Sequence, residues 1–402
     1  MPKILLLGGD SDSNVGDTAI LLSLCQCIAR VKPGAQVSVL SNRPTLADLL
    51  RRSAGNGSDG RADISVLPRG PGGLASLLRV APRQDLIIVG GGGLFQDDDS
   101  RIKMPYWAAR IALLRALNDR IVGHALGAGP LDHLESRGCA RMACGSLRSV
   151  SVRDPFARRW LARSIGRDVA VVPDPAFMLE PAPKESAEAL IRSLGLTPGK
   201  PLIAVALRRW FHQRGGFIPH RVRAGAGLDR GQGQAQMATL RGEFGAALQR
   251  LSRRLGASVL LMPSYHAAHE GDAHECAQLL GQLDGVEARV ASIDDPALYK
   301  AVAGLATLMI SARMHPLILA ASMGVPIVGL AYNGKFEGLF HLLRRRTGMA
   351  WIEGLAQDSG ASELQQLALA ALEEPNELKE RCVELAAVAL ASTRDLVREA
   401  TV

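Results

Sequence analysis

The sequence predicts an α/β protein with two doubly wound, Rossmann-like domains that face each other across a central cleft. Strand-like and helix-like segments alternate in two successive series, a proline-punctuated polar stretch separates the series, and motifs rich in glycine, aspartate or arginine follow several strands. We expect an N-terminal domain over residues 1–182 and a C-terminal domain over residues 200–355. Residues 356–402 should form helices that pack back across the junction.

In the first series, short apolar runs alternate with amphipathic segments such as 18–31 and 104–118. This rhythm is typical of βαβ units, in which parallel strands are joined by helices that cover both faces of the sheet. The expected strands are residues 3–7, 36–40, 63–67, 85–90, 120–126, 149–153 and 169–172.

The second series follows a connection that contains Pro181, Pro183 and Pro198. Residues 212–234 are rich in glycine and arginine and show no period, so we expect a long basic loop there, which is either functional or a tolerated insertion. The expected strands are residues 202–207, 258–262, 305–310 and 326–330, and the alanine-rich stretch 363–400 should be helical.

The composition indicates which kinds of ligand the protein could bind and whether it could cross a membrane. The 402 residues carry 47 basic and 39 acidic side chains, a formal charge of +8, which suits an anionic substrate or an anionic membrane surface. Aromatic residues make up only 4%, and there is no compact Lys/Arg run that could track a phosphate backbone, which argues against nucleic acid. No apolar run approaches the roughly 20 residues of a membrane span, so we expect a cytoplasmic protein, with peripheral contact at the inner membrane face as an open option.

The six cysteines show no CxxC pair and no spacing typical of zinc ligands. Neither a disulfide framework nor a metal site is therefore expected, and we expect mostly buried thiols.

The segment 311–335 is the most informative part of the chain. Arg313 and His315 follow an apolar strand, and Pro316 is expected to open a short helix that ends at Gly324. A helix amino end attracts anions, and the arginine adds a fixed cation beside a titratable imidazole. An anion-binding, reactive site is therefore predicted here, against the simpler reading of a structural histidine.

Similar motifs follow other expected strands. Four glycines, 90–93, allow close approach of a ligand to the backbone, and Asp97 just beyond could act as a base toward an alcohol. Arg153 precedes Asp154 and Pro155, which are expected to cap and start a helix. Each motif has a structural alternative, namely a tight turn or a surface ion pair. Two further motifs contain Asn14, Gly16 and Asp17, with Asp17 as the expected N-cap, and the adjacent Arg208 and Arg209.

Ligands of open parallel sheets bind outside the carboxyl ends of the strands, which is where all these motifs lie. Two facing sheets would place Asp97 and Arg153 on one wall of a cleft. The other wall would carry Arg208, Arg209, Arg313 and His315.

Taken in order and spacing, the motifs resemble the polysaccharide pyruvyl transferase family over nearly the whole chain, from Ile4 to about Leu343. The departures are Thr18, where an acidic residue is common, and the long Gly/Arg loop, and both concern the acceptor more than the chemistry. The matching motifs are Asn14-x-Gly16-Asp17, Gly91-Gly92-Gly93-Leu-Phe-Gln96-Asp97, Gly127-Ala-Gly129-Pro130, Ser151-Val-Arg153-Asp154, Asp174-Pro175-Ala-Phe177, and Arg313-Met-His315-Pro with Gly324-Val-Pro326 and Tyr332-x-x-Lys335.

The resemblance implies a fold like that of the two-domain glycosyltransferase B (GT-B) enzymes. It also implies transfer of an enolpyruvyl unit from phosphoenolpyruvate to a sugar of a cell-surface polysaccharide, which leaves a pyruvate ketal. Phosphoenolpyruvate would be a co-substrate, with no other cofactor, and the acceptor would be a glycan or a lipid-linked oligosaccharide.

The family's site residues can be placed on this sequence by their motifs. His315 and Asp97 would be catalytic, and Arg153, Arg313, His315 and Lys335 would bind phosphoenolpyruvate. Additional substrate contacts are expected from Asn14, Asp17, Gly92, Gly93, Arg208 and Arg209.

Two other functions stay open at this level. One is a sugar-nucleotide glycosyltransferase of the same architecture, because a fold does not decide a function. The other is an inactive module that binds a sugar or a polyprenyl phosphate, against which the presence of both Arg313 and His315 counts.

Overall fold

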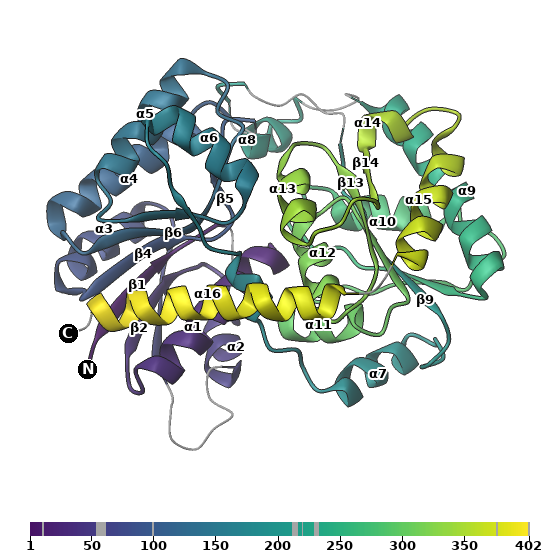
Figure 1. The fold of residues 1–402 in the computed structure, drawn as a ribbon, viewed down its shortest axis with the longest axis horizontal. Helices are drawn as coiled ribbons and strands as arrows, with labels where there is room; N and C mark the ends of the chain where they lie inside the picture. Colours follow the sequence, from purple (N-terminus) through teal and green to yellow (C-terminus); the bar gives the residue numbers. More distant parts are fainter. Residues whose placement is uncertain are drawn as a thin grey trace.

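The computed structural model describes residues 1–9, 12–53, 62–98, 100–210, 216–218, 220–228, 233–374 and 377–400. Two parallel sheets, each flanked by helices, lie side by side (Figure 1). The α/β class with two doubly wound domains is confirmed.

The first sheet has the strand order β3-β2-β1-β4-β6-β7-β8, and the short β5 pairs with β6. All its pairings are parallel; Ile4 of β1, for example, lies opposite Val37 of β2 and Leu86 of β4. Its strands are β1 (Lys3–Leu7), β2 (Gln36–Leu40), β3 (Asp63–Leu67), β4 (Leu86–Gly90), β5 (Gly93–Phe95), β6 (Ile121–Ala128), β7 (Val150–Val152) and β8 (Ala170–Val171).

The second sheet has the order β11-β10-β9-β12-β13-β14, which is the 3-2-1-4-5-6 order of the Rossmann fold when counted from its own first strand. Its strands are β9 (Leu202–Ala206), β10 (Ser258–Leu261), β11 (Ala288–Val290), β12 (Leu308–Ser311), β13 (Ile327–Ala331) and β14 (Met349–Trp351).

Helices separate successive strands in both halves, except that β5 follows β4 after Gly91 and Gly92. The first half contains α1 (Val15–Val31), α2 (Leu46–Ser53), α3 (Pro71–Val80), the 3₁₀ turn η1 (Ala81–Arg83), α4 (Lys103–Leu117), α5 (Leu134–Gly145), α6 (Pro155–Ile165) and η2 (Pro175–Met178). The rest of the chain contains α7 (Lys184–Ser193), α8 (His220–Gly225), α9 (Gln234–Leu255), α10 (Asp272–Leu280), α11 (Pro296–Ala303), α12 (Met314–Ala321), α13 (Lys335–Leu342), α14 (Ile352–Leu355), α15 (Gly360–Glu373) and α16 (Leu378–Ala400).

Strand β1 shows how the sheet divides the core. Leu5 and Leu7 point to one face and pack in the cluster that contains Trp107 of α4, whereas Ile4 and Leu6 point to the other face. The cluster on that second face continues through Phe177 of η2 into the second sheet. One apolar core therefore links the two halves.

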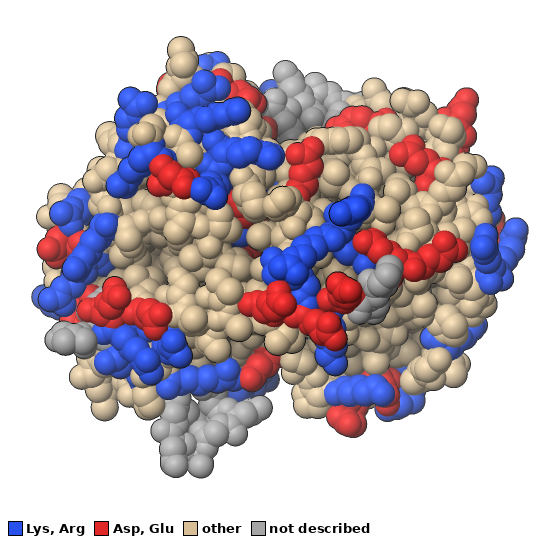
Figure 2. All heavy atoms as spheres, in the orientation of Figure 1, with Lys and Arg blue, Asp and Glu red and all other residues tan. Residues whose placement is uncertain are grey.

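Helix α16 crosses from the second half to the first, where it packs on α1 and η2 (Figure 1). The buried ring of His124 in β6 contacts it through a 2.9 Å hydrogen bond between Nε2 and the Thr393 hydroxyl. On the face that α16 crosses, basic and acidic side chains are interspersed (Figure 2).

Some expectations about local structure are wrong. Asn14, and not Asp17, caps α1: its side chain accepts hydrogen bonds from the amides of Gly16 and Asp17. Helix α12 begins at Met314, two residues before Pro316, because Arg313 takes the cap position. By contrast, Asp154 caps α6 and Pro155 starts it, as predicted.

The expected loop over 212–234 lies partly outside the described residues. Within the part that is described, 220–225 form the short helix α8, and α9 begins at Gln234.

Candidate functional site

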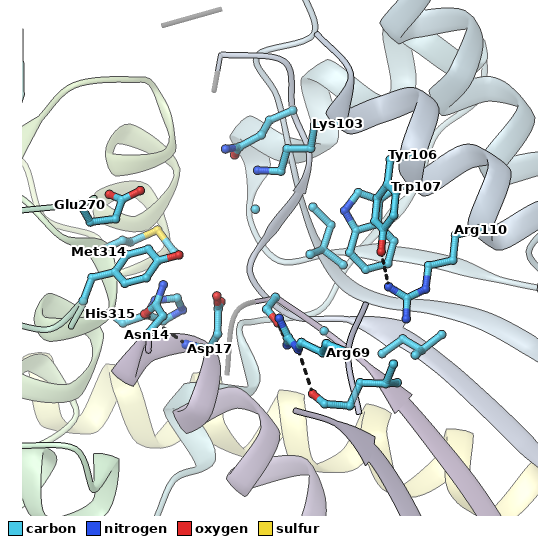
Figure 3. A pocket seen from close by; sticks show the side chains of 18 of the residues that line it. Asn14, Asp17, Arg69, Lys103, Tyr106, Trp107, Arg110, Glu270, Met314 and His315 are labelled. Carbon is cyan, nitrogen blue, oxygen red and sulfur yellow. Dashed lines mark hydrogen bonds between the residues drawn. The ribbon is translucent and has the colours of Figure 1, made fainter. Parts of the chain in front are cut away.

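A cavity of about 810 Å³, here called the central cavity, lies between the two halves. It is bordered by residues that follow β1, β3, β5 and β7 of the first sheet and β9, β10, β12 and β13 of the second. Its volume is within the range of small-molecule sites. Figure 3 shows His315, Met314 and Asn14 on one side of it and Tyr106, Trp107 and Arg110 on the other.

Arg153 lines the central cavity at the end of β7, although its side chain is only 5% exposed. Its Nη1 donates a 3.1 Å hydrogen bond to Asp174, and its Nε lies 3.4 Å from a carboxylate oxygen of Asp154. A Cβ at position 127 would come within 3.1 Å of the guanidinium carbon, so Gly127 leaves room for Arg153. Within the described part of the chain, Nε of Arg153 has no hydrogen-bond partner.

His315 lies in the first turn of α12 and reaches across to the first half. Its Nε2 is 3.6 Å from Oδ2 of Asp174, too long for a hydrogen bond, and has no hydrogen-bond partner among the described residues. A Cβ at position 16 would lie 2.0 Å from its Nδ1, so the imidazole rests directly on the backbone of Gly16.

Asp174 joins Arg153 and His315 electrostatically. Burial alone would raise the pKa of this carboxyl, but His315 and Arg153 together outweigh burial and lower the pKa to about 2. The carboxylate therefore stays ionised at neutral pH. It holds Arg153 in place through the hydrogen bond to Nη1 and lies beside the imidazole of His315.

Arg313 and Arg208 share carboxylates of the second half. Arg313 donates to Glu270 at 3.0 Å and through Nε to Asp272 at 3.1 Å, while Nη2 of Arg208 lies 3.4 Å from Glu270. Burial would lower the pKa of Arg313, but Asp272 and Glu270 raise it strongly. Much of the hydrogen-bonding capacity of Arg313 is thus used within the protein, and a positioning role fits it well.

Lys335 and Tyr332 form a second titratable pair in the central cavity. The ammonium group donates to the Tyr332 hydroxyl. Burial tends to raise the pKa of Tyr332, but the positive charges of Lys335, Arg208 and Arg313 lower it to about 8. Burial lowers the pKa of Lys335. The pair can therefore exchange a proton near neutral pH more readily than an isolated tyrosine or lysine.

The central cavity brings together most of the residues that the sequence singled out. Those in its lining are Asn14, Asp17, Gly93, Arg153, Arg208, Arg313, His315 and Lys335.

Three residues that we expected at the site do not line it. The oxygens of Asp97 accept hydrogen bonds from the amides of Asp132 and His133, at 3.2 and 3.0 Å, so this carboxylate fixes the turn after β6. Gly92 supports the site from behind, because a Cβ there would come within 2.5 Å of the Asp17 carboxylate. Arg209 packs its side chain near Gly271.

Asp98 lines the central cavity in place of its neighbour Asp97 and accepts a 3.1 Å hydrogen bond from Asn333. Sequence reasoning gave no role to Glu270 and Asp272, although both follow β10 at the same sheet edge. It quoted Asp174 and Tyr332 only as parts of motifs.

Within the described ranges, no group of three or more His, Cys, Asp or Glu side chains could hold a metal ion. All six cysteines are free thiols, and all but Cys139 are buried. Among the helices described, none is both long and apolar enough to cross a bilayer.

Comparison with known protein families shows to which family the chain belongs. A family model of polysaccharide pyruvyl transferase matches residues 14–334. The matched range contains Arg153, Arg313 and His315 and ends one residue before Lys335. The chain belongs to the polysaccharide pyruvyl transferase family. A search among curated protein sequences finds no match.

The fold is also similar to solved structures of GT-B type. They include a UDP-GlcNAc 2-epimerase from Neisseria meningitidis bound to UDP-GlcNAc, with 10% identity, 99% of each chain covered and a TM-score of 0.56. A glycosyltransferase from Rickettsia africae has 12% identity, covers 99% of this chain and 98% of its own, and has a TM-score of 0.57. A UDP-GlcNAc 2-epimerase from Methanocaldococcus jannaschii has 10% identity, 98% coverage of both chains and a TM-score of 0.59. At this identity the likeness shows the fold alone.

Proposed function

We propose that this member of the family transfers the enolpyruvyl unit of phosphoenolpyruvate to a sugar and releases phosphate, forming a pyruvate ketal. The acceptor would be a sugar of a cell-surface polysaccharide or of its lipid-linked precursor. The proposal rests above all on the pair Arg153 and His315. Each has a buried ring or guanidinium nitrogen at the central cavity without a hydrogen-bond partner in the described structure, and buried polar groups in proteins are normally paired.

Phosphoenolpyruvate fits such a pair. Its carboxylate and phosphate are acceptors for guanidinium and imidazolium donors, and these charge-assisted hydrogen bonds are the strong ones. Asp174 lies next to both groups: it accepts a hydrogen bond from Arg153 and is 3.6 Å from Nε2 of His315. A donor subsite at Arg153 and His315 would therefore bind the anion where His315 can also deliver a proton.

The proposed reaction balances as follows. The enol carbon takes up a proton and becomes a methyl group, and an acceptor hydroxyl forms a bond to the adjacent carbon. The bond from that carbon to the phosphate oxygen breaks, and a second hydroxyl closes the ketal. Of the two hydroxyl protons lost by the acceptor, the methyl group accounts for one and phosphate for the other.

Acid–base help is needed at the enol carbon and at the hydroxyls. His315, polarised by Asp174, is our candidate for protonating the enol carbon, and the Tyr332–Lys335 pair lies in the same cavity as a candidate proton acceptor. The wall formed by Asp17, Asp98 and Gln96 supplies acceptors for sugar hydroxyls.

A turnover assay tests this function. With phosphoenolpyruvate and a panel of glycans, we expect phosphate release only when a suitable glycan is present, and a product heavier by one pyruvate less one water. His315→Ala should lower turnover by about 10² to 10⁴, the usual contribution of general acid–base catalysis, whereas His341→Ala on the exposed surface of α13 should not. Turnover of a nucleotide sugar with phosphoenolpyruvate ignored would establish the glycosyltransferase function instead.

A further inference from the structure

The central cavity continues away from Arg153 and His315 into a groove between α3 and α4, which we call the apolar end. Its lining includes Leu74 and Leu77 of α3 and Trp107 and Leu113 of α4. Leu74 and Leu113 are 48% and 38% exposed, so apolar surface faces the solvent there. None of the family motifs lies on these two helices.

Arg110 of α4 projects into the apolar end. Its Nη1 donates a 2.7 Å hydrogen bond to the Tyr106 hydroxyl, and its guanidinium lies 5.5 Å from the centre of the Trp107 ring. In the described structure no carboxylate pairs with it. Burial lowers the pKa of Arg110, and the nearby charge of Arg69 acts in the same direction.

Arg69 lies between Arg110 and the His315 side of the cavity (Figure 3). Its Nε donates to the carbonyl of Leu40 at 3.2 Å and its Nη2 to the carbonyl of Gly9, so the backbone holds it in place. Asp12 lies 3.7 Å from its Nε. Helices α3 and α4 contain no acidic residue, and the local field therefore favours an anion between the two guanidinium groups.

We propose that Arg110 and Arg69 form a second anion subsite, which binds the diphosphate that carries the acceptor sugar. The guanidinium group of Arg110 suits the oxygens of a diphosphate, and the backbone-bound Arg69 adds a fixed positive charge beside it. One end of the diphosphate carries the sugar, which then points toward Arg153 and His315. The group esterified to the other end of the diphosphate lies in the apolar end of the cavity. The assignment to the acceptor depends on the proposed function, but binding of a diphosphate does not.

Calorimetry on the full chain tests the subsite directly. Inorganic pyrophosphate, geranyl diphosphate and UDP are each titrated in the presence of saturating phosphoenolpyruvate, which blocks the other anion site. The variant is Arg110→Gln, and the matched control is Arg115→Gln, because Arg115 is an exposed arginine on the same helix and donates to the nearby Asp119 carbonyl. Melting temperatures verify that both variants are folded.

We expect geranyl diphosphate to bind the wild type more tightly than pyrophosphate does, because the apolar end can cover its chain. Arg110→Gln should weaken diphosphate binding about tenfold, or about 1.4 kcal/mol, which is typical of one hydrogen bond to a charged group. Arg115→Gln and the affinity for phosphoenolpyruvate should stay at wild-type values. If UDP binds more tightly than geranyl diphosphate, the result would support the same diphosphate subsite, with an acceptor linked to a nucleotide.

The proposal is overturned if no diphosphate binds the wild type, or if folded Arg110→Gln binds as well as Arg115→Gln does. Titration of phosphoenolpyruvate alone separates this failure from failure of the proposed function. A protein that binds diphosphate and ignores phosphoenolpyruvate would keep the second subsite and lose the donor chemistry.

Discussion

Asp174 is the residue on which both halves of the candidate donor site depend. It comes from the first half, where it accepts a hydrogen bond from Arg153, and it lies 3.6 Å from His315 of the second half. Since its pKa is held near 2, it remains a carboxylate over the working range of most enzymes. Removing such a charge would leave Arg153 buried and poorly compensated, which is generally costly.

Gly16 offers a test of how finely His315 must be placed. Ala at position 16 would put a Cβ 2.0 Å from Nδ1, so we expect the imidazole to shift and turnover to fall by about 10²-fold, as misplacements near 1 Å can do. Gly138→Ala is the matched control, because no atom of the described residues lies within 4 Å of a Cβ at this helical glycine of α5. Steady-state kinetics and thermal melts of both variants provide the comparison. Wild-type turnover in Gly16→Ala would show that the close contact has no role.

The sequence identified residues at strand ends better than it distinguished between neighbours. Arg153 and His315 were predictable, because carboxyl ends of parallel strands converge on one edge. Asp97 and Asp98 were not distinguishable, since the path of one turn decides which carboxylate meets backbone amides and which meets the central cavity. Arg110 was not predicted, because the sequence analysis looked for site residues that follow strands, and Arg110 lies in the middle of a helix.

At the scale of elements, α16 ties the end of the chain to the first half. Its Thr393 hydroxyl is hydrogen-bonded to His124 of β6. Burial lowers the pKa of His124 to about 4. A buried neutral histidine therefore couples the attachment of α16 to pH.

The sign of this coupling can be worked out. Between pH 6.5 and about 4 the unfolded chain binds a proton at His124 and the folded chain does not, so the free energy of unfolding falls as the pH falls. Between pH 7 and 5 this one group should account for about 2 kcal/mol of that fall.

Denaturant unfolding at the two pH values measures the effect. His124→Gln, which can still bond to Thr393, should lose less stability on acidification than the wild type does, and exposed His341→Gln should behave like the wild type. Equal losses in all three proteins would show that the buried imidazole is not responsible.

Apolar runs predicted most strands, including the short β7 and β8. Three other short strands, β5, β11 and β14, have three residues each and were not predicted. The start of α1 was misplaced because Asn14 and Asp17 are both good caps by residue type, and only the backbone decides between them.

At the scale of the whole molecule, two Rossmann-ordered sheets share one apolar core and enclose the central cavity between their carboxyl edges. The GT-B-like fold was predicted from the family resemblance, and the paired alternating series supported it. That fold also serves the epimerases and the glycosyltransferase to which this chain is similar. The reaction must therefore be decided by the residues in the cavity, in particular by what Arg153 and His315 bind.

The most direct measurement is a calorimetric titration of phosphoenolpyruvate into the wild type, Arg153→Gln and Arg158→Gln. Arg158 is the control, because it is exposed and paired with Asp168 on the surface of α6. We predict that the wild type binds phosphoenolpyruvate, that folded Arg153→Gln binds it more weakly by about 1.5 to 3 kcal/mol, and that Arg158→Gln matches the wild type. A wild type that does not bind phosphoenolpyruvate, or equal affinity in all three folded proteins, would contradict the donor site proposed at Arg153 and His315.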